Sequence, residues 1–299
     1  MIHYPRLSEE LFTIRDWLRF TVSRFEESEI FFGHGTDNAY DEAVWLILSA
    51  LHLPHDTLHN FLDAVITEPE RKHLAHLIER RITERVPTAY LLHEAWLHGF
   101  KFYVDERVIV PRSFIAELLE ESLSPWIEYP ELIHSAADIC TGSGCLGVLL
   151  AHAFPDAQID VVDISPDAIA VCNINIANYG LQEQITAIQS DMFSALKGKK
   201  YDLIISNPPY VDAPSMATLP REYQNEPQLA LGSGADGLDH THTILREAKK
   251  HLSDNGILVV EIGHNREALI DTYPDLPFIW LEVESGNEFV FLLTKEQLN

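Results

Sequence analysis

The first third of the chain repeats apolar residues at the spacing of an α-helix. From residue 8 to about residue 85 they recur at intervals of three and four, which places them on one face of successive helices. The first predicted helix has its apolar positions at Leu11, Ile14, Trp17, Leu18 and Val22, and further predicted helices cover residues 40–51, 58–66 and 70–81. Pro69 suits the first turn of the last helix, while residues 31–41 mix glycine, polar and aromatic residues and predict a loop. We expect a small helical domain over residues 1–95.

A β-hairpin is predicted after this domain. Between Gly99 and Pro111, apolar residues alternate with polar ones on either side of residues 105–107, which is the pattern of two short strands joined by a turn. The alternating apolar positions are Phe100, Phe102, Val104, Val108 and Val110. We expect this hairpin to be a connector over residues 96–112, ending at Pro111-Arg112.

The remainder of the chain alternates strand and helix patterns. Short apolar runs predict strands at residues 136–140, 159–163, 185–189, 201–206 and 256–262. Helical patterns separate them at residues 114–123, 146–153, 166–178 and 238–252. This alternation predicts an α/β domain over residues 113–299, with a doubly wound, mostly parallel sheet between helices. Residues 278–284 and 289–294 read as strands joined by a turn at residues 285–288, which adds an antiparallel C-terminal strand.

The chain is strongly acidic. Its 46 aspartates and glutamates outnumber its 21 lysines and arginines, which gives a formal net charge of -25. A field of that sign repels free nucleic acid and attracts basic proteins, although an acidic surface also serves solubility alone. We expect a basic protein partner and no binding of free nucleic acid.

Cysteine usage and hydropathy bear on the compartment. Cys140, Cys145 and Cys172 are odd in number and lack the paired spacing of a disulfide framework. Residues 1–6 lack the layout of a signal peptide, and no apolar run reaches the length of a membrane span. We expect a reduced, cytoplasmic protein that does not associate with membranes.

Histidines in the helical segment do not add up to a metal site. His52, His55 and His59 are spaced to share roughly one helix face. A metal site needs a third or fourth ligand with supporting contacts, and the sequence offers none. We expect solvated histidines and no metal.

A glycine-rich segment joins the first predicted strand of the α/β domain to a helix. Gly142, Gly144 and Gly147 match the spacing G-x-G-x-x-G of nucleotide-binding loops. Asp163 follows about twenty residues later at the end of the second predicted strand, where a carboxylate can accept from both ribose hydroxyls. The cofactor contacts expected from the loop are Asp138, Thr141, Gly142, Ser143 and Gly144.

A further acid ends the third predicted strand. Asp191 stands beside Met192, so that an adenine edge could be read there and its faces covered by apolar groups. The glycines could instead serve close helix–strand packing, and the aspartates could cap the next turns. Two nucleoside cofactors suit the loop, a nicotinamide dinucleotide and S-adenosyl-L-methionine.

The turn at residues 206–210 discriminates between these two candidate cofactors. It ends a buried strand with Asn207-Pro208-Pro209-Tyr210, and prolines cannot continue a sheet ladder. The side-chain carbonyl of Asn207 and the main-chain carbonyl of Pro208 could accept from the two hydrogens of a planar amino group, on which Tyr210 could stack. Both bonds would strengthen as charge develops during methylation of that nitrogen. The turn therefore favours S-adenosyl-L-methionine.

These residues together resemble the protein-glutamine N5-methyltransferases, a family of class I S-adenosylmethionine-dependent methyltransferases. The shared pattern comprises residues 138–144, Asp163, Ser190-Asp191, residues 207–210, Glu226-Pro227 and Ala230-Leu231, with the helical domain and the hairpin ending in Pro-Arg. The resemblance covers nearly the whole chain, whereas the Asn-Pro-Pro-Tyr turn alone also occurs in adenine-N6 DNA methyltransferases. It implies the class I methyltransferase sheet and S-adenosyl-L-methionine as cofactor.

Within the family, the chain is most similar to the branch that modifies the third protein of the large (50S) ribosomal subunit. The segments that match this branch, and not the release-factor branch, are residues 32–39, 94–96 and 110–118. Cys140 stands where many relatives have glycine, which is usual in this branch. His93 and Leu97 stand where the family pattern has glycine and phenylalanine, which bears on local packing.

The resemblance implies direct methyl transfer to a glutamine side-chain nitrogen, without a metal or a dedicated base. Asn207 and Pro208 would hold the amide and Tyr210 would pack on it, with Pro209 as the remaining residue of the catalytic turn. Asn207 would also contact the cofactor, while the helical domain would recognise a basic ribosomal protein. A release-factor glutamine methyltransferase and a nucleic-acid adenine-N6 methyltransferase are the alternative enzymes, and the net charge disfavours the second. A binding or assembly factor without turnover is a further alternative, against which the intact turn argues.

Overall fold

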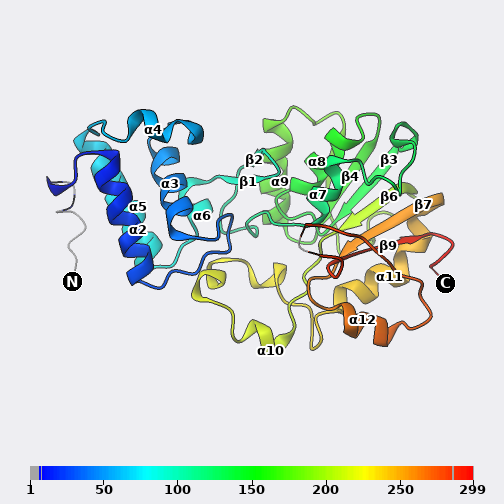
Figure 1. The fold of residues 1–299 in the computed structure, drawn as a ribbon. Coiled ribbons are helices and arrows are strands. Elements are labelled where there is room, and N and C mark those ends of the chain that lie inside the picture. Colours follow the sequence, from blue (N-terminus) through cyan, green and yellow to red (C-terminus); the bar gives the residue numbers. More distant parts are fainter. Residues whose placement is uncertain (1–6, 8, 285, 299) are drawn as a thin grey trace. The chain divides into compact units, whose positions relative to one another are not determined.

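The computed structural model describes residues 7, 9–284 and 286–298, and these fall into two compact units (Figure 1). The helical unit comprises the described part of Met1–Ala95 with Val104–Glu106 and Pro220–Asn225. The sheet unit comprises Trp96–Tyr103, Arg107–Leu219 and the described part of Glu226–Asn299. The inferences about a signal peptide at residues 1–6 and about Ser285 in a turn lie outside the described residues.

A seven-stranded sheet forms the centre of the sheet unit, in the order β5-β4-β3-β6-β7-β9-β8. Its strands are β3 (Ser135–Ile139), β4 (Gln158–Asp163), β5 (Ile185–Gln189), β6 (Tyr201–Ser206), β7 (Leu252–Glu261), β8 (Ile279–Trp280) and β9 (Val290–Thr294). The strands β3 to β7 pair in parallel, whereas β9 is antiparallel to both β7 and β8. The predicted mostly parallel sheet with an antiparallel C-terminal strand is confirmed, although β8 is shorter than predicted.

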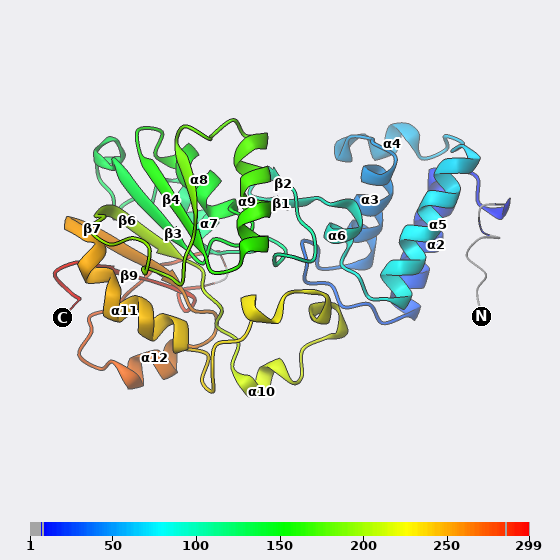
Figure 2. The same ribbon diagram turned by 180° about the vertical axis from the view of Figure 1, so that it is seen from behind.

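Helices cover both faces of this sheet (Figures 1 and 2). They are α7 (Ile115–Glu120), α8 (Cys145–Ala153), α9 (Pro166–Asn178), α11 (Asp239–His251) and α12 (Arg266–Thr272), with the short α10 (Ala213–Met216) in a loop. The helices α8 and α9 contact β4 and β5, and α11 contacts β7. The helix predicted for residues 166–178 is confirmed at both ends. Its start is fixed by Ser165, which accepts from Ala168 N, and by Pro166 in the first turn.

The helical unit contains α2 (Ile14–Glu27), α3 (Ala39–Ala50), α4 (Leu58–Phe61), α5 (Glu68–Thr83) and α6 (Thr88–Leu92). Thr13 and Asp16 form a capping box at the start of α2. The predicted helix over residues 58–66 is wrong beyond Phe61, because residues 62–66 bond to the main chain of residues 12–15 instead.

The predicted grouping of His52, His55 and His59 on one helix face is also wrong. His52 has a positive φ of 56° after the end of α3, and His55 begins a separate 3₁₀ turn, His55–Thr57. Within the described residues, no cluster of three or more histidine, cysteine or acidic side chains is arranged to hold a metal ion. In the same described part of the chain, no helix combines the length and apolarity needed to cross a membrane.

The connector contains a hairpin, but not at the predicted place. The strands β1 (Ala95–Leu97) and β2 (Phe100–Phe102) pair around His98 and Gly99, whose φ values of 46° and 79° suit a two-residue turn. Residues 103–112, all of them described, contain no strand. Side chains replace the expected ladder, since Asn175 bonds both the N–H and the C=O of Tyr103.

The presence of His93, where the family pattern has glycine, has a local explanation. His93 ends α6 in the left-handed conformation, with a φ of 51°, where glycine is ordinarily favoured. Its Nδ1 lies 3.3 Å from the carbonyl oxygen of Val104. The histidine thus occupies a glycine-type position at a helix end, while Leu97 is buried in β1.

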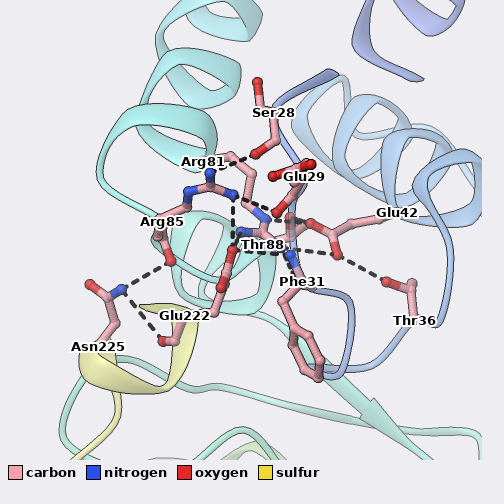
Figure 3. A network of polar contacts seen from close by, with 10 residues as sticks. All are labelled: Ser28, Glu29, Phe31, Thr36, Glu42, Arg81, Arg85, Thr88, Glu222 and Asn225. Atoms are coloured by element: carbon pink, nitrogen blue, oxygen red, sulfur yellow. Dashed lines mark hydrogen bonds and ion pairs between the residues drawn. The ribbon is translucent and has the colours of Figure 1, made fainter. Parts of the chain in front are cut away.

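A buried network of charges links several segments of the helical unit (Figure 3). The guanidinium of Arg81 bonds Glu42 at 2.5 Å and the carbonyl of Phe31 at 3.0 Å, and it lies 3.5 Å from Glu222. Arg85 lies 3.3 Å from the same oxygen of Glu222. Since Arg81, Glu42 and Glu222 are all nearly fully buried, the segment that carries Glu222 is an integral part of this unit.

Candidate active site

A pocket lies where the parallel strands β3 to β6 end. The direction in which the chain adds strands reverses between β3 and β6, and ligands bind at such a switch point in open α/β sheets. The predicted site residues that line the pocket are Gly142, Asp163, Asp191, Met192, Asn207 and Pro209. Further lining residues include Arg107, Val108, Ile109, Cys140, Ile164, Ser190, Pro227, Leu229, Ala230 and His240.

The glycines of the loop before α8 have different tasks. Gly142 borders the pocket with a φ of 56°, and no atom lies within 4 Å of the position that a Cβ would take, so the main chain is open to a ligand there. A Cβ on Gly144 would meet Cys172 Sγ at 2.6 Å, and one on Gly147 would meet Val161 at 2.4 Å. Of the two uses that the sequence allowed for these glycines, Gly142 borders the ligand pocket, and Gly144 and Gly147 serve close helix–strand packing.

Three polar residues of this loop face inward. Asp138, Thr141 and Ser143 are buried and are not among the described residues that line the pocket. The hydroxyl of Thr141 donates to Asp138 at 2.5 Å, and burial raises the pKa of Asp138 to about 7. These residues, and Gly144, are thus placed to support the loop from behind.

Asp163 holds the loop from the pocket side. Its two carboxylate oxygens accept from the main-chain N–H groups of Gly142 and Ser165, each at 2.9 Å. Burial raises the pKa of Asp163, against the effect of these bonds. A carboxylate has lone pairs beyond those two bonds, so Asp163 can still accept from a ligand.

The far side of the pocket combines Asp191 and Met192 with a histidine that the sequence did not single out. His240 lies at the start of α11, and its Nδ1 is 2.7 Å from the Ser233 hydroxyl. Burial lowers the pKa of His240, which favours the neutral imidazole. A histidine in a helix about thirty residues after the turn carries no local signal, so sequence reasoning could not have found it.

Asn207 is oriented by a main-chain contact. Its Nδ2 donates to the carbonyl oxygen of Arg112 at 3.1 Å, which leaves its Oδ1 as the atom that can accept from a substrate. Pro209 lines the pocket beside it, whereas Pro208 is buried. The use of the Asn207 carbonyl as an acceptor for a substrate stays a prediction.

Tyr210 is held by the segment that follows β7. Asn265 Nδ2 donates to the Tyr210 carbonyl at 2.8 Å, and the ring lies so close to Gly263 that a Cβ there would meet it at 2.7 Å. Its phenol donates to Glu261. Tyr210 is not among the described lining residues of the pocket.

Comparisons with known proteins point to a family of methyltransferases. A family model described as Methyltransferase small domain matches residues 117–219, and one described as PrmC N-terminal domain matches residues 16–92. The ribosomal protein uL3 glutamine methyltransferase of Neisseria gonorrhoeae is 61% identical over 295 residues, which cover 99% of this chain and 98% of that protein. The protein of the same name from Bordetella pertussis is 53% identical over 291 residues, covering 97% and 98% respectively.

A solved structure shares the fold. The hMettl16 catalytic domain, in complex with the MAT2A 3'UTR hairpin 6, matches with a TM-score of 0.50 at 13% identity, over 78% of this chain and 84% of that one. This likeness concerns the fold alone, and together with the strand order it identifies a class I methyltransferase sheet. Given identities above 50% over almost its whole length, the chain belongs to the ribosomal protein uL3 glutamine methyltransferase family.

Proposed function

We propose that this protein methylates the side-chain nitrogen of a glutamine in ribosomal protein uL3, with S-adenosyl-L-methionine as the methyl donor. The observation that carries the proposal is the full-length similarity, at 61% and 59% identity, to relatives named for that activity. The same similarity disfavours the release-factor alternative. The formal net charge of -25 disfavours a nucleic-acid substrate.

The pocket residues fit the proposed cofactor. Asp163 can accept from ribose hydroxyls, and Asp191 adds a second carboxylate at the end of the next strand. Met192, Ile164 and Leu229 offer apolar walls for a purine ring. When bound, the cofactor supplies a methyl group activated by a positively charged sulfur.

The Asn-Pro-Pro-Tyr turn would orient the glutamine amide. Asn207 Oδ1 would accept one amide hydrogen and the Pro208 carbonyl the other, which fixes the plane of the nitrogen. Both acceptors would interact more strongly as positive charge develops on that nitrogen. Tyr210 would support the turn and the bound amide. The methyl transfer itself would need no dedicated base.

We infer that residues 1–95 form a substrate-recognition domain, residues 96–112 a connector and residues 113–299 the catalytic domain. The substrate would be basic, as RNA-binding ribosomal proteins generally are, and the acidic enzyme would attract it. This division remains a proposal, whose boundaries follow the sequence.

A labelling experiment tests the function. The purified protein would be incubated with tritiated S-adenosyl-L-methionine and ribosomal proteins from a strain that lacks the enzyme, with release factors and ribosomal RNA in parallel. We expect label in the uL3 band. Label confined to a release factor or to RNA would assign the protein to an alternative, and a complete lack of label would indicate a factor without turnover.

A further inference from the structure

A buried carboxylate fixes the main chain beside the pocket. The side chain of Glu226 is fully buried. It accepts from the main-chain N–H of Val110 at 2.9 Å and from the guanidinium of Arg112 at 2.8 and 2.6 Å. These partners precede Glu226 by 116 and 114 positions in the sequence. Glu226 therefore anchors residues 110–112 at both a main-chain and a side-chain point.

The anchored segment ends on the Asn-Pro-Pro-Tyr turn. The carbonyl of Arg112 accepts from Asn207 Nδ2 at 3.1 Å. Because the nitrogen and oxygen of an amide point in different directions, holding the nitrogen also sets the direction of the oxygen. We propose that Glu226 is a positioning residue for methyl transfer, which acts through Arg112 to orient the Asn207 carbonyl. This inference rests on the proposed function of Asn207.

Stability alone is a weak reason for such a carboxylate. A buried ion pair often contributes no more than apolar side chains of the same volume, because both charges lose their hydration. What the bidentate contact between Glu226 and Arg112 adds is a fixed geometry. A geometric requirement exists here, since small misplacements of a reacting group cost large factors in rate.

Glu226 also precedes a second wall of the pocket. Pro227, Leu229 and Ala230 follow it directly and line the pocket. A change at Glu226 could therefore act on cofactor binding as well as on Asn207. The two effects are separable, because the first changes the cofactor dissociation constant and the second changes kcat.

The test compares Glu226→Ala with Glu226→Gln, which keeps the shape and the ability to accept from Val110 but loses the charge. We expect kcat on uL3 to fall at least tenfold in Glu226→Ala and less in Glu226→Gln. The cofactor dissociation constant and the KM for uL3 should change by less than about threefold. Lys199→Gln is the matched control, since it removes an ion pair with Asp160 in the same unit and neither residue lines the pocket that holds Asn207.

A double-mutant cycle with Asn207→Ala asks whether the two residues act together. If Glu226 acts through Asn207, adding Glu226→Ala to Asn207→Ala should lower kcat by less than about threefold. The inference would be overturned if the fold-losses of kcat in the two single variants multiplied in the double variant, or if Glu226→Ala had a wild-type kcat. In contrast, the proposed function fails when the wild-type enzyme itself leaves uL3 unmethylated.

A measurement on the free protein needs no activity. The side-chain amide resonance of Asn207 can be assigned by its absence from the spectrum of Asn207→Ala. We expect this resonance to shift in Glu226→Ala and to stay in place in Lys199→Gln. An unshifted resonance in Glu226→Ala would show that Glu226 does not position the amide.

Discussion

The phenol of Tyr210 lies 3.3 Å from a carboxylate oxygen of Glu261, which is buried at the end of β7. The other oxygen of Glu261 accepts from the Ser113 hydroxyl at 2.6 Å and from the main-chain N–H of Phe114 at 2.9 Å. One carboxylate thus ties the Asn-Pro-Pro-Tyr turn to Ser113 and Phe114. Because Glu261 is buried, its ionised form is disfavoured, and the stability of the fold should therefore depend on pH.

The stability of the protein should reflect two buried acids. Burial raises the pKa of Glu261 to about 7 and that of Asp138 to about 7, whereas both ionise near pH 4 in an unfolded chain. Between these values the folded state binds more protons, so stability falls as pH rises from about 4 to 7 and then levels off. From the size of these shifts, Glu261 should contribute roughly 3 kcal/mol and Asp138 roughly 4 kcal/mol to this fall.

Glu261→Gln and Asp138→Asn should therefore gain stability relative to wild type between pH 5 and pH 7.5, as measured by denaturant unfolding. Asp202→Asn is the control. Burial acts to raise the pKa of Asp202, but hydrogen bonds from Ser253, His134 and Ser135 outweigh it and the pKa is lowered. Its difference from wild type should stay flat over this range. Flat differences for the first two variants would contradict their raised pKa values.

A second prediction concerns the cofactor. Asp163→Ala removes the acceptor proposed for the ribose and also releases the N–H of Gly142. The loss of a charge-assisted bond of about 1.5–3 kcal/mol should weaken cofactor binding more than tenfold. Isothermal titration calorimetry measures this directly. Asp167→Asn, an exposed change in the next helix, should bind normally, and unchanged binding by Asp163→Ala would refute the assignment.

A third prediction concerns the network in Figure 3. Glu222→Ala leaves Arg81 buried beside one carboxylate instead of two and leaves the N–H of Phe31 without its 3.2 Å bond to Glu222. Breaking a buried pair in this way should lower the free energy of unfolding of the helical unit by about 3 kcal/mol. Glu84→Ala, which breaks an exposed pair with Arg80, should cost less than about 1 kcal/mol. An equal loss of unfolding free energy in the two variants would show that the buried network contributes no more than an exposed ion pair.

The elements that the sequence predicted well are those with local signals. Buried parallel strands are continuous apolar runs, and all five predicted strands of the parallel sheet are present. The helix Pro166–Asn178 carries its own cap and its own proline. The predicted place of the hairpin in the connector was wrong. The main-chain N–H groups of Tyr103 and Val110 bond the side chains of Asn175 and Glu226, which lie far away in the sequence.

The same limit applies to the candidate site. The acids at the strand ends and the residues of the turn were predictable, because strand ends and fixed spacings mark them. The groups that orient them were not, since Arg112 meets Asn207 across 95 positions and Glu261 meets Tyr210 across 51. A single sequence contains no signal for such contacts.

Charge should govern the encounter with the substrate. The enzyme carries a net charge of -25, and opposite fields accelerate association in a way that salt screens. We expect kcat/KM on free uL3 to decline as salt rises through the physiological range, while cofactor affinity changes little. Intact large subunits, whose RNA phosphates repel the enzyme, should be poor substrates. A rate indifferent to salt, or equal rates on free uL3 and intact subunits, would exclude charge attraction from substrate choice.

We propose that this chain methylates a glutamine nitrogen of uL3 and that Asn207 orients this nitrogen. Mass spectrometry of free uL3, incubated with S-adenosyl-L-methionine and either wild-type enzyme or Asn207→Ala, tests this proposal most directly. We expect one added methyl group on a glutamine side chain with the wild type, and a rate lower by about two orders of magnitude with Asn207→Ala, as for the loss of one transition-state hydrogen bond. A methyl group on another residue type, or equal rates for the two enzymes, would contradict the account.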